Sequence, residues 1–590
     1  MRKSPHAEEP PRAATPAEFL FDLFSRQQST DEKIKALEPR LDGPAARNFR
    51  NQMASWALQF LPVEALVPDL YAQWRPLVQD AMRFVFCHLS SPRLAPKLIE
   101  QMDLPPDTKP EVRLLRLIAK VPGLQKLGQV LARNRHLPPG LGKALSELEN
   151  GNSDVRAPEV GAIILGSLGP RLDAHAVEIE SKIFSEASVS AVVRFTWRNP
   201  ETKRRERGVF KVLKPYIPAC FAEDMDLLAR LAKFLGSRHR DYGFAPHVLA
   251  DTFDDVRRLL QHEVDFTREQ ATLVKAAQLY RLVRGVRVPR LIQPLCTNRI
   301  TAITEEQGKK ITDAVVRMPA WRRAHVSAQL VDALIAIPLF APAGDVMFHA
   351  DPHAGNLLYD PRSGELVILD WALTEHLGRA QRRHLAMLFL MIVLRDPVGA
   401  CAALEALSPP GGRRERSRVR IIRRSVTGFM DGLPLKHMAG AVDTMNLLER
   451  VAFAGLRLPA TLVMFRKALF TLDGILHDLG APDFSLESVM VRHLIQNWIG
   501  SWKAIGSPLS LGDWLQVQSS ALLFPARLWV RGAQAVLERK GAELPRPAPS
   551  RGPSRPRSAA CREASIGDRS PGPARPIRMG ENHSSAQRGG

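Results

Sequence analysis

Cysteine is scarce in this chain of 590 residues. The five cysteines are scattered without C-x-x-C spacing, at Cys87, Cys220, Cys296, Cys401 and Cys561. Their number and spacing exclude a disulfide scaffold and a cysteine-based zinc site, and they fit a reducing compartment. Hydrophobic residues make up 45% and charged residues 24% of the chain. This mix allows a sizeable buried core and excludes a wholly disordered or fibrous protein.

Long hydrophobic runs are also missing. The longest unbroken apolar run, Leu385 to Leu394, has ten residues, and as a helix it would rise only ~15 Å, about half of a bilayer core. The first residues, Met1 to Pro16, are polar and lack the apolar segment of a secretory signal. We therefore expect a buried helix at the apolar run, no transmembrane helix and no signal peptide. We expect a cytoplasmic protein that can be peripheral to the inner face of a membrane.

Acidic residues are outnumbered by basic ones, 61 against 82, which gives a net charge of +21. Such an excess can attract anionic lipid, polyphosphate ligands or nucleic acid. Part of the charge lies in the tail from Leu544 to Gly590, where Pro, Arg, Ser and Gly dominate, and we expect this tail to be disordered. Because the tail has no interleaved aromatic residues, nucleic acid is the weaker alternative.

The segment from Leu511 to Arg539 is amphipathic. Trp514 and Trp529 lie among leucines and arginines, and Pro525 interrupts the pattern. A basic segment with tryptophans can lie on an anionic membrane surface. We favour the alternative, in which the segment packs back on the folded body.

The residue pattern changes twice along the chain. Between Pro16 and Ile118, helical periodicity broken by prolines predicts several short helices, and after Thr312 the pattern is again mostly helical. Between these parts we expect strands at Val189–Trp197, Gly208–Leu213, Val286–Pro289 and Arg299–Thr304, and long helices at Phe221–Leu235 and Val256–Tyr280. This order predicts an α+β fold in which a small strand-rich lobe precedes a larger helical lobe. Two such lobes usually hold a site in the cleft between them.

The densest polar cluster runs from Phe348 to Leu358. Within it Asp351 is followed five residues later by Asn356, and Asp370 lies nineteen residues after Asp351, at the end of an apolar run. Phosphoryl transfer from ATP requires a carboxylate near the attacking hydroxyl group and hard oxygen ligands that hold Mg²⁺. The catalytic and metal-binding loops of protein kinases use this order of residues. The cluster therefore predicts a site for ATP and Mg²⁺.

Each of these residues also has a structural explanation. Asp351 could cap a turn, Asn356 could adopt the left-handed conformation, and Asp370 could cap the next helix. Any one residue alone would favour that explanation. All three together, in order and at this spacing, favour the nucleotide–metal site.

His349 and His353 raise a further alternative, a zinc site. The H-x-x-x-H spacing places both rings on one face only if the segment is helical. Pro352 and Gly355 argue against a helix here. We therefore disfavour zinc.

Lys211 lies inside an apolar strand pattern. A buried ammonium is costly unless it has partners, and its natural partners would be nucleotide phosphates and a carboxylate on a helix. Asp265 and Glu269, four residues apart on a predicted helix, are the candidates. The alternative is that Lys211 reaches solvent from an edge strand.

Five segments occur in a fixed order: Lys126-Leu127-Gly128-Gln129, Val209-Phe210-Lys211, Glu263 to Glu269, His349 to Asn356, and Leu369-Asp370. Together they resemble the UbiB/AarF family of atypical kinase-like proteins. The H-x-D-P-H-x-G-N string is highly specific, whereas K-x-G-Q is short. The resemblance runs from about Lys126 to about Leu486, and it includes a stretch from Leu458 to Gly474 that resembles the C-lobe helices of the family.

The resemblance implies a two-lobed protein-kinase-like fold with a helical N-terminal extension. The expected parts are a helical N-terminal region (1–110), an extension with the K-x-G-Q motif (111–180), an N-lobe (181–310), a helical C-lobe (311–490), amphipathic helices (491–543) and a disordered tail (544–590). In the family, the extension is thought to block protein substrates and to favour ATPase or small-molecule chemistry.

The resemblance also implies roles for individual residues. Asp351 matches the catalytic-loop acid, and Lys211, paired with Glu269, matches the lysine that contacts the nucleotide phosphates. Cofactor-binding positions are Ala187, Ser188, Lys126, Gln129, Glu263 and Asp265. Asn356 and Asp370 match the Mg²⁺ ligands.

The sequence departs from the family at three places. The nucleotide loop of the family is typically A-A-A-S, and the matching stretch here is Ser185 to Ala191. Within it, Glu186 places an acid beside the proposed phosphates. Repulsion between these like charges would weaken ATP binding or require more metal. A family asparagine is Thr272 here. The metal-loop tripeptide is Asp370-Trp371-Ala372, and Ala in place of Gly would restrict the backbone.

The residues and the resemblance together imply two alternative functions, and the link to quinone or lipid metabolism comes from the resemblance. The first is an ATP- and Mg²⁺-dependent atypical kinase or ATPase that acts on a small-molecule or lipid substrate, or supports quinone or other lipid-linked metabolism. The second is a catalytically weak nucleotide-binding scaffold that docks partners at a membrane surface. The sequence is compatible with an oligomer.

Overall fold

The computed structural model describes residues 16–25, 28–43, 46–67, 69–126, 155–243, 246–341, 344–409, 415–435, 439–480 and 508–543, with a few residues between 484 and 493. Two compact units divide the chain, Met1–Trp529 and Val530–Gly590. The strand-rich lobe, the helical lobe and the candidate site all lie in the first unit. The predicted tail from Leu544 lies outside the described residues.

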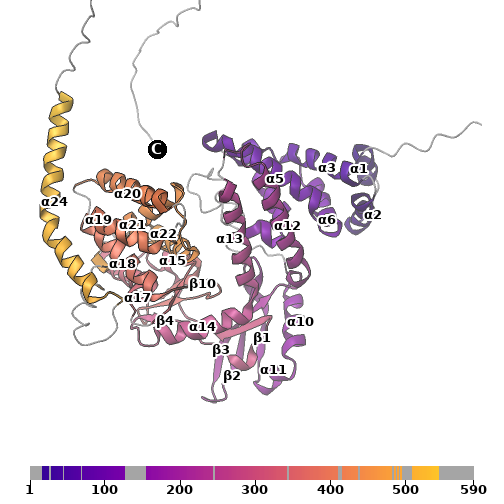
Figure 1. Ribbon diagram of the computed structural model, residues 1–590. Helices are drawn as coiled ribbons and strands as arrows, with labels where there is room; N and C mark the ends of the chain where they lie inside the picture. The colour runs from indigo at the N-terminus through magenta and orange to yellow at the C-terminus, as the bar shows by residue number, and fades with distance from the viewer. Residues whose placement is uncertain are drawn as a thin grey trace, which may run out of the picture. The chain divides into compact units, whose positions relative to one another are not determined.

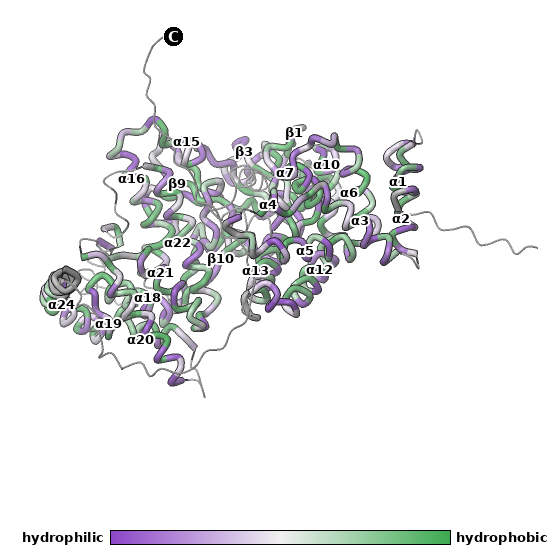
Figure 2. The backbone as a smooth tube through the Cα atoms, turned by 90° about the horizontal axis from the view of Figure 1, so that it is seen from above, coloured by the Kyte–Doolittle hydropathy of each residue, from purple (hydrophilic) through white to green (hydrophobic). Residues whose placement is uncertain are grey.

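The N-terminal region consists of short helices, as the sequence predicted. Prolines begin several of them, because proline at the first turn lacks only an N–H that has no partner there. The helices are α1 (Pro16–Ser25), α2 (Thr30–Asp42), α3 (Ala46–Phe60), α4 (Val63–Leu66), α5 (Arg75–His88), α6 (Ser91–Asp103) and α7 (Pro110–Ile118). Apart from α4, which packs in a separate small cluster with Ile118, they share one hydrophobic core with two later helices, α12 (Ile217–Ser237) and α13 (Pro246–Val264). In both ribbon and tube views α5, α12 and α13 lie side by side (Figure 1, Figure 2).

The strand-rich lobe is built on a four-stranded antiparallel sheet in the order β1-β2-β3-β5. The strands are β1 (Glu178–Glu186), β2 (Ser190–Arg198), β3 (Arg205–Leu213) and β5 (Ile300–Thr304), and α10 (Ala157–Leu168) and α11 (Pro170–Ala174) precede them. Lys211 lies in the central strand β3, opposite Val192 and Thr301. Because side chains alternate between the two faces of the sheet along a strand, the register of β3 determines the face on which Lys211 lies.

The prediction of one continuous helix over Val256–Tyr280 is wrong, because the structure has two helices in this range. α13 ends at Val264 and α14 (Phe266–Tyr280) begins after Asp265. Asp265 has a non-helical backbone, and its carboxylate accepts a hydrogen bond of 3.0 Å from the N–H of Arg268. This N-cap starts a new helix, so Glu263 and Glu269 lie on different helices.

The second lobe is mostly helical, which confirms the predicted α+β class. Its helices are α15 (Ile311–Ala314), α16 (Ala320–Val331), α17 (Ile337–Phe340), α18 (Arg379–Val393), α19 (Pro397–Leu407), α20 (Glu415–Gly432), α21 (Ala441–Phe453) and α22 (Ala460–Leu479). Two small sheets lie beside them, β4-β9-β8-β6 and β10-β7. Their strands are β4 (Val286–Arg287), β6 (Lys309–Lys310), β7 (Val346–His349), β8 (Leu357–Asp360), β9 (Glu365–Ile368) and β10 (Thr374–Leu377). These sheets present the loops that carry Asp351, Asn356 and Asp370.

Two apolar stretches of the second lobe lie in its core. The residues of the run Leu385–Ile392 are at most 8% exposed, which confirms the predicted buried helix. Among the described helices one stretch, Ala320–Phe340, has the length and composition of a membrane span. It includes a π-helical turn, and its side chains Val326, Leu330 and Leu334 are at most 1% exposed within the core.

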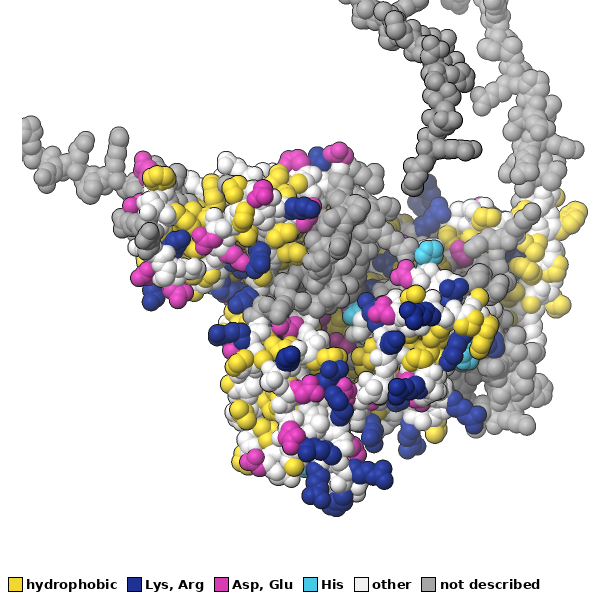
Figure 3. Space-filling view, turned by 180° about the vertical axis from the view of Figure 1, so that it is seen from behind, with side chains coloured by type: hydrophobic (Ala, Val, Ile, Leu, Met, Phe, Trp, Pro, Cys, Tyr) yellow, Lys and Arg dark blue, Asp and Glu magenta, His cyan; other side chains and the backbone are white. Residues whose placement is uncertain are grey.

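The amphipathic segment forms one helix, α24 (Leu511–Glu543), which Pro525 does not interrupt, contrary to the sequence prediction. Asp513 pairs with Arg383 at 2.7 Å, and Arg527 pairs with Asp396 at 3.2 Å. This face of the helix packs on the folded body, as we favoured. The other face stays exposed, with apolar side chains along it (Figure 3) at Leu511, Leu515, Leu522 and Trp529.

Candidate active site

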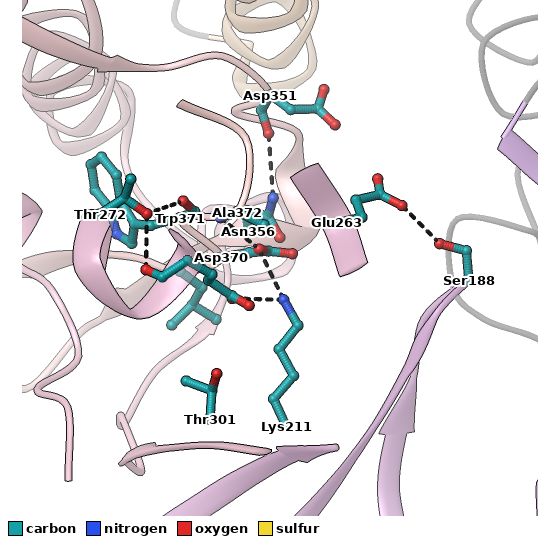
Figure 4. Close-up of polar contacts among 12 residues, drawn as sticks. Ser188, Lys211, Glu263, Thr272, Thr301, Asp351, Asn356, Asp370, Trp371 and Ala372 are labelled. Atoms are coloured by element: carbon teal, nitrogen blue, oxygen red, sulfur yellow. Dashed lines mark hydrogen bonds and ion pairs between the residues drawn. The ribbon is translucent and has the colours of Figure 1, made fainter. Parts of the chain in front are cut away.

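Lys211 joins the two lobes. Its Nζ atom lies 2.7 Å from Oε1 of Glu269 on α14 and 3.2 Å from Oδ1 of Asp370, which follows β9 (Figure 4). The Lys211 side chain is 15% exposed. Its predicted pairing with Glu269 is therefore present, and the alternative that it extends into solvent from an edge strand is wrong.

The charges in this triad stabilise one another. Burial alone would lower the pKa of Lys211, but the carboxylates of Asp370 and Glu269 outweigh it and hold that pKa above its ordinary value. Burial would raise the pKa of Asp370, yet the ammonium of Lys211 outweighs it and keeps that pKa low. For Glu269 burial dominates and raises the pKa, although Lys211 opposes the rise. Lys211 is thus a charged donor that faces an ionised Asp370.

Asp370 has a backbone conformation that suits its short polar side chain. Its φ is 51°, in the left-handed region, and its Oδ1 accepts a hydrogen bond of 3.2 Å from the N–H of Ala372. The explanation that Asp370 caps a following helix is wrong, because strand β10 comes next. Ala372 itself has no positive φ, so alanine fits here without strain where the family has glycine.

Trp371 and Thr272, at two of the departures from the family, contact each other. The Trp371 side chain is 1% exposed, and its indole N–H donates to the carbonyl of Ile368 at 3.1 Å. The hydroxyl of Thr272 on α14 lies 2.8 Å from the carbonyl oxygens of both Trp371 and Glu269. This hydroxyl ties the helix that carries Glu269 to the loop that carries Asp370. Sequence reasoning named both residues as differences and missed that they form a contact.

His349 fixes the backbone at Asp351. The N–H of Asp351 donates to Nδ1 of His349 at 3.2 Å, so the proton of the neutral ring sits on Nε2, which donates to the carbonyl of Leu369 at 3.1 Å. Burial lowers the pKa of His349 and keeps the ring neutral. Both ring nitrogens are engaged, so His349 cannot ligate zinc. Among the described residues no group of three or more His, Cys, Asp or Glu side chains could hold a metal ion.

Asn356 lies between Asp351 and Asp370. Its Nδ2 donates to the backbone carbonyl of Asp351 at 3.3 Å (Figure 4), and Asn356 and Asp370 both line the cleft. Asn356 does not have a positive φ, so the left-handed explanation is wrong. An amide oxygen and a carboxylate suit Mg²⁺, which needs only one or two protein ligands when phosphates and water supply the others. The donor set therefore fits Mg²⁺.

The extension reaches the cleft through Lys126. Its Nζ forms an ion pair with Oε1 of Glu263, and the hydroxyl of Ser188 donates to the other oxygen of Glu263 at 3.2 Å. Ala187 lines the same cleft, whose volume is about 70 Å³. Gln129, predicted with Lys126, lies outside the described residues. Asp265 is the N-cap of α14, and its assignment as a cofactor-binding residue stays a prediction.

Glu186 does not face the cleft, contrary to our expectation. Its carboxylate lies 3.2 Å from Nζ of Lys214, and the two side chains are 6% and 1% exposed. Lys214 follows β3 in the sequence and offsets the charge of Glu186. The sequence contained Lys214, but strand pairing was needed to place it beside the loop.

Lys467, on α22, was also missed. Its Nζ lies 3.5 Å from Oδ1 of Asp351. This stretch resembles the C-lobe helices of the family, but no local pattern indicates that the Lys467 side chain reaches the catalytic loop.

The two lobes, the ion pair across them and the oxygen ligands on adjacent loops define a protein-kinase-like protein. Residues 148–403 match the family described as the ABC1 atypical kinase-like domain. Over these residues the chain is similar to that domain, and the resemblance to the UbiB/AarF family that the motifs predicted is confirmed.

Several curated relatives are similar to the chain. Protein ACTIVITY OF BC1 COMPLEX KINASE 7, chloroplastic, of Arabidopsis thaliana is 24% identical over 62% of this chain and 51% of its own length. The probable protein kinase UbiB of Actinobacillus pleuropneumoniae is 23% identical over 63% of this chain and 68% of its own. The chain thus spans about half the length of the first of these relatives.

A solved structure, that of Rv3197 with erythromycin from Mycobacterium tuberculosis, is 16% identical, with a TM-score of 0.39 over 60% of this chain and 87% of that chain.

Proposed function

We propose that the protein is an ATP- and Mg²⁺-dependent atypical kinase or ATPase. The observation that carries the proposal is the Lys211 ammonium, which lies 2.7 Å from Glu269 and 3.2 Å from Asp370. A buried cation beside an ionised carboxylate is the arrangement with which kinases hold nucleotide phosphates and metal in one place. The match to the atypical kinase-like domain supports it.

Each residue has a physical task in this proposal. Lys211 would bind and orient the phosphates, and Glu269 orients Lys211. Asn356 and Asp370 would hold Mg²⁺, which, when bound, offsets the negative charge of the phosphates. Asp351 would position the nucleophile, either water or a substrate hydroxyl group, through a hydrogen bond to its carboxylate.

The acceptor in this proposal is small. The Lys126–Glu263 ion pair lines the same cleft as Asp351, so the extension occupies space beside the proposed nucleophile that a protein segment would need. This supports water or a small-molecule hydroxyl group as the acceptor, in the quinone-linked or lipid-linked metabolism that the family resemblance implies. The exposed apolar face of α24 supports a peripheral contact with an anionic membrane.

Release of inorganic phosphate from ATP tests the proposal. We expect Mg²⁺-dependent release by the wild type and a loss of at least about a hundredfold in Asp351→Asn. Equal rates in the two proteins would overturn the role of Asp351. Repeating the assay with vesicles of phosphatidylglycerol and of phosphatidylcholine tests the membrane contact, because only the anionic vesicles should change the rate.

The size of the cleft favours the second candidate, a nucleotide-binding scaffold with weak turnover. Ligand pockets usually measure at least about 300 Å³, and the cleft measures about 70 Å³, so nucleotide entry requires the cleft to widen. Both candidates bind ATP with Mg²⁺, and only the first releases phosphate. If the wild type binds ATP with Mg²⁺ but releases no phosphate, the protein is the nucleotide-binding scaffold and not the kinase or ATPase.

A further inference from the structure

Three lysines from three distant parts of the chain each form an ion pair with a carboxylate of the candidate site. Lys126 from the extension pairs with Glu263, and Lys211 from the strand-rich lobe pairs with Glu269 and Asp370. The third, Lys467 from the helical lobe, lies with its Nζ 3.5 Å from Oδ1 of Asp351. The first two fit roles that the family motifs imply. The role of Lys467 is new.

Helix α22 is held in a fixed position relative to the loop of Asp351. Phe465, two residues before Lys467, packs edge-on against Phe348 of β7 with ring centroids 5.2 Å apart. Phe465 and Ala468 are each 1% exposed. Because β7 leads directly into Asp351, this packing sets the distance between the helix and the catalytic loop.

The two partners differ in exposure. The Asp351 side chain is 7% exposed and the Lys467 side chain 27%. A carboxylate so far removed from water requires a compensating charge. The ammonium is on the outer side of the pair, at the end of a flexible stem that can follow the carboxylate as it moves.

We propose, on the basis of the proposed function, that Lys467 is the positioning residue of Asp351. Its ammonium holds Oδ1 and leaves lone pairs of the carboxylate for the hydroxyl group of the nucleophile. Lys467 thus acts through Asp351 and orients it for the acceptor.

The test compares two neighbouring cations on α22. In Lys467→Met the turnover number for ATP with Mg²⁺ should fall about tenfold or more, with the dissociation constant for ATP and Mg²⁺ changed less than about twofold. Arg466→Met is the matched control, because Arg466 is 26% exposed and pairs with Glu449 at 3.4 Å, away from Asp351. The control should keep the wild-type turnover number.

A conservative variant separates positioning from simple stabilisation. Lys467→Arg keeps a cation of similar reach and should recover turnover to within about threefold of the wild type. If Lys467→Met and Lys467→Arg lose turnover equally, and both lower the melting temperature, the residue is structural and the proposal is overturned.

Two further results distinguish this inference from the proposed function. Full turnover in Lys467→Met, beside an inactive Asp351→Asn, overturns the inference alone. A wild type that binds ATP with Mg²⁺ but does not turn over overturns both, because there is then no nucleophile to position.

Discussion

The Nζ atom of Lys211 in strand β3 lies 3.2 Å from Oδ1 of Asp370, although the two residues are 159 positions apart in the sequence. The same ammonium lies 2.7 Å from Glu269 on α14. One side chain therefore connects the sheet of the first lobe, the helix beside it and the loop that follows β9.

Removal of this ammonium should cost stability as well as function. Lys211→Met leaves Glu269, whose side chain is 6% exposed, without its cation, and breaking a buried pair from one side typically costs about 3–5 kcal/mol. We expect a loss of that size in chemical denaturation. The double variant Lys211→Met/Glu269→Leu should recover most of it, because the one carboxylate of the triad then left without the ammonium is Asp370, whose side chain is 41% exposed. A single variant as stable as the wild type would show that the pair is not formed.

Thr272 should support the metal loop. Thr272→Val keeps the shape of the side chain and removes the hydroxyl group that lies 2.8 Å from the carbonyl of Trp371. We expect a loss of about 1–2 kcal/mol in unfolding free energy, together with a higher Mg²⁺ concentration for half-maximal ATP binding. Thr272→Ser, which retains the hydroxyl group, serves as the control. If Thr272→Val needs the same Mg²⁺ concentration as the wild type, the hydrogen bond between Thr272 and Trp371 does not affect Mg²⁺ binding, and the prediction is wrong.

Glu186→Ala brings the nucleotide loop closer to the alanine-rich pattern of the family. If Glu186 repelled the phosphates, this change would tighten ATP binding. The structure instead pairs Glu186 with Lys214 at 3.2 Å, with both side chains buried, so we expect unchanged ATP affinity and a loss of about 3–5 kcal/mol in stability. Calorimetric titration and thermal unfolding of the same variant decide between the two outcomes, and tighter binding would refute the structural assignment.

Acid should destabilise the protein through its histidines. Burial lowers the pKa of His262 to about 4 and also lowers the pKa of His349. An unfolded histidine titrates near about pH 6.5, so between about pH 6.5 and 4 the unfolded chain binds protons that the folded chain does not. The stability contribution is therefore complete above about pH 6.5 and is lost as the pH falls through this window.

Unfolding measured from pH 7 to pH 4 checks this dependence. The wild type should lose stability steadily over that range, and His262→Gln should show a shallower loss. Equal slopes for the two proteins would contradict the account of His262.

The sequence predicted most of the two-lobed architecture, because local patterns encode it. Alternating apolar residues placed Lys211 in a strand, and the spacing of Asp351, Asn356 and Asp370 predicted adjacent loops. The break between α13 and α14 was missed because Asp265 caps a helix inside a continuous apolar periodicity.

Contacts between distant residues could not be predicted in the same way. The pairs Glu186–Lys214 and Asp351–Lys467 join segments whose distance depends on how sheets and helices pack. Neither partner of these pairs carries a local signal that identifies the other. The same holds for the hydroxyl of Thr272, which reaches Trp371 only once α14 lies against the loop after β9.

The most direct test of the central claim is calorimetric titration of ATP into the full chain, with Mg²⁺ and with EDTA, for the wild type and for Asp370→Asn. Asparagine keeps the shape and tolerates the left-handed backbone of Asp370, so the variant should remain folded. We predict Mg²⁺-dependent binding to the wild type and affinity at least about tenfold weaker in the variant. Equal affinity in the two proteins, or binding that does not respond to Mg²⁺, would contradict the account.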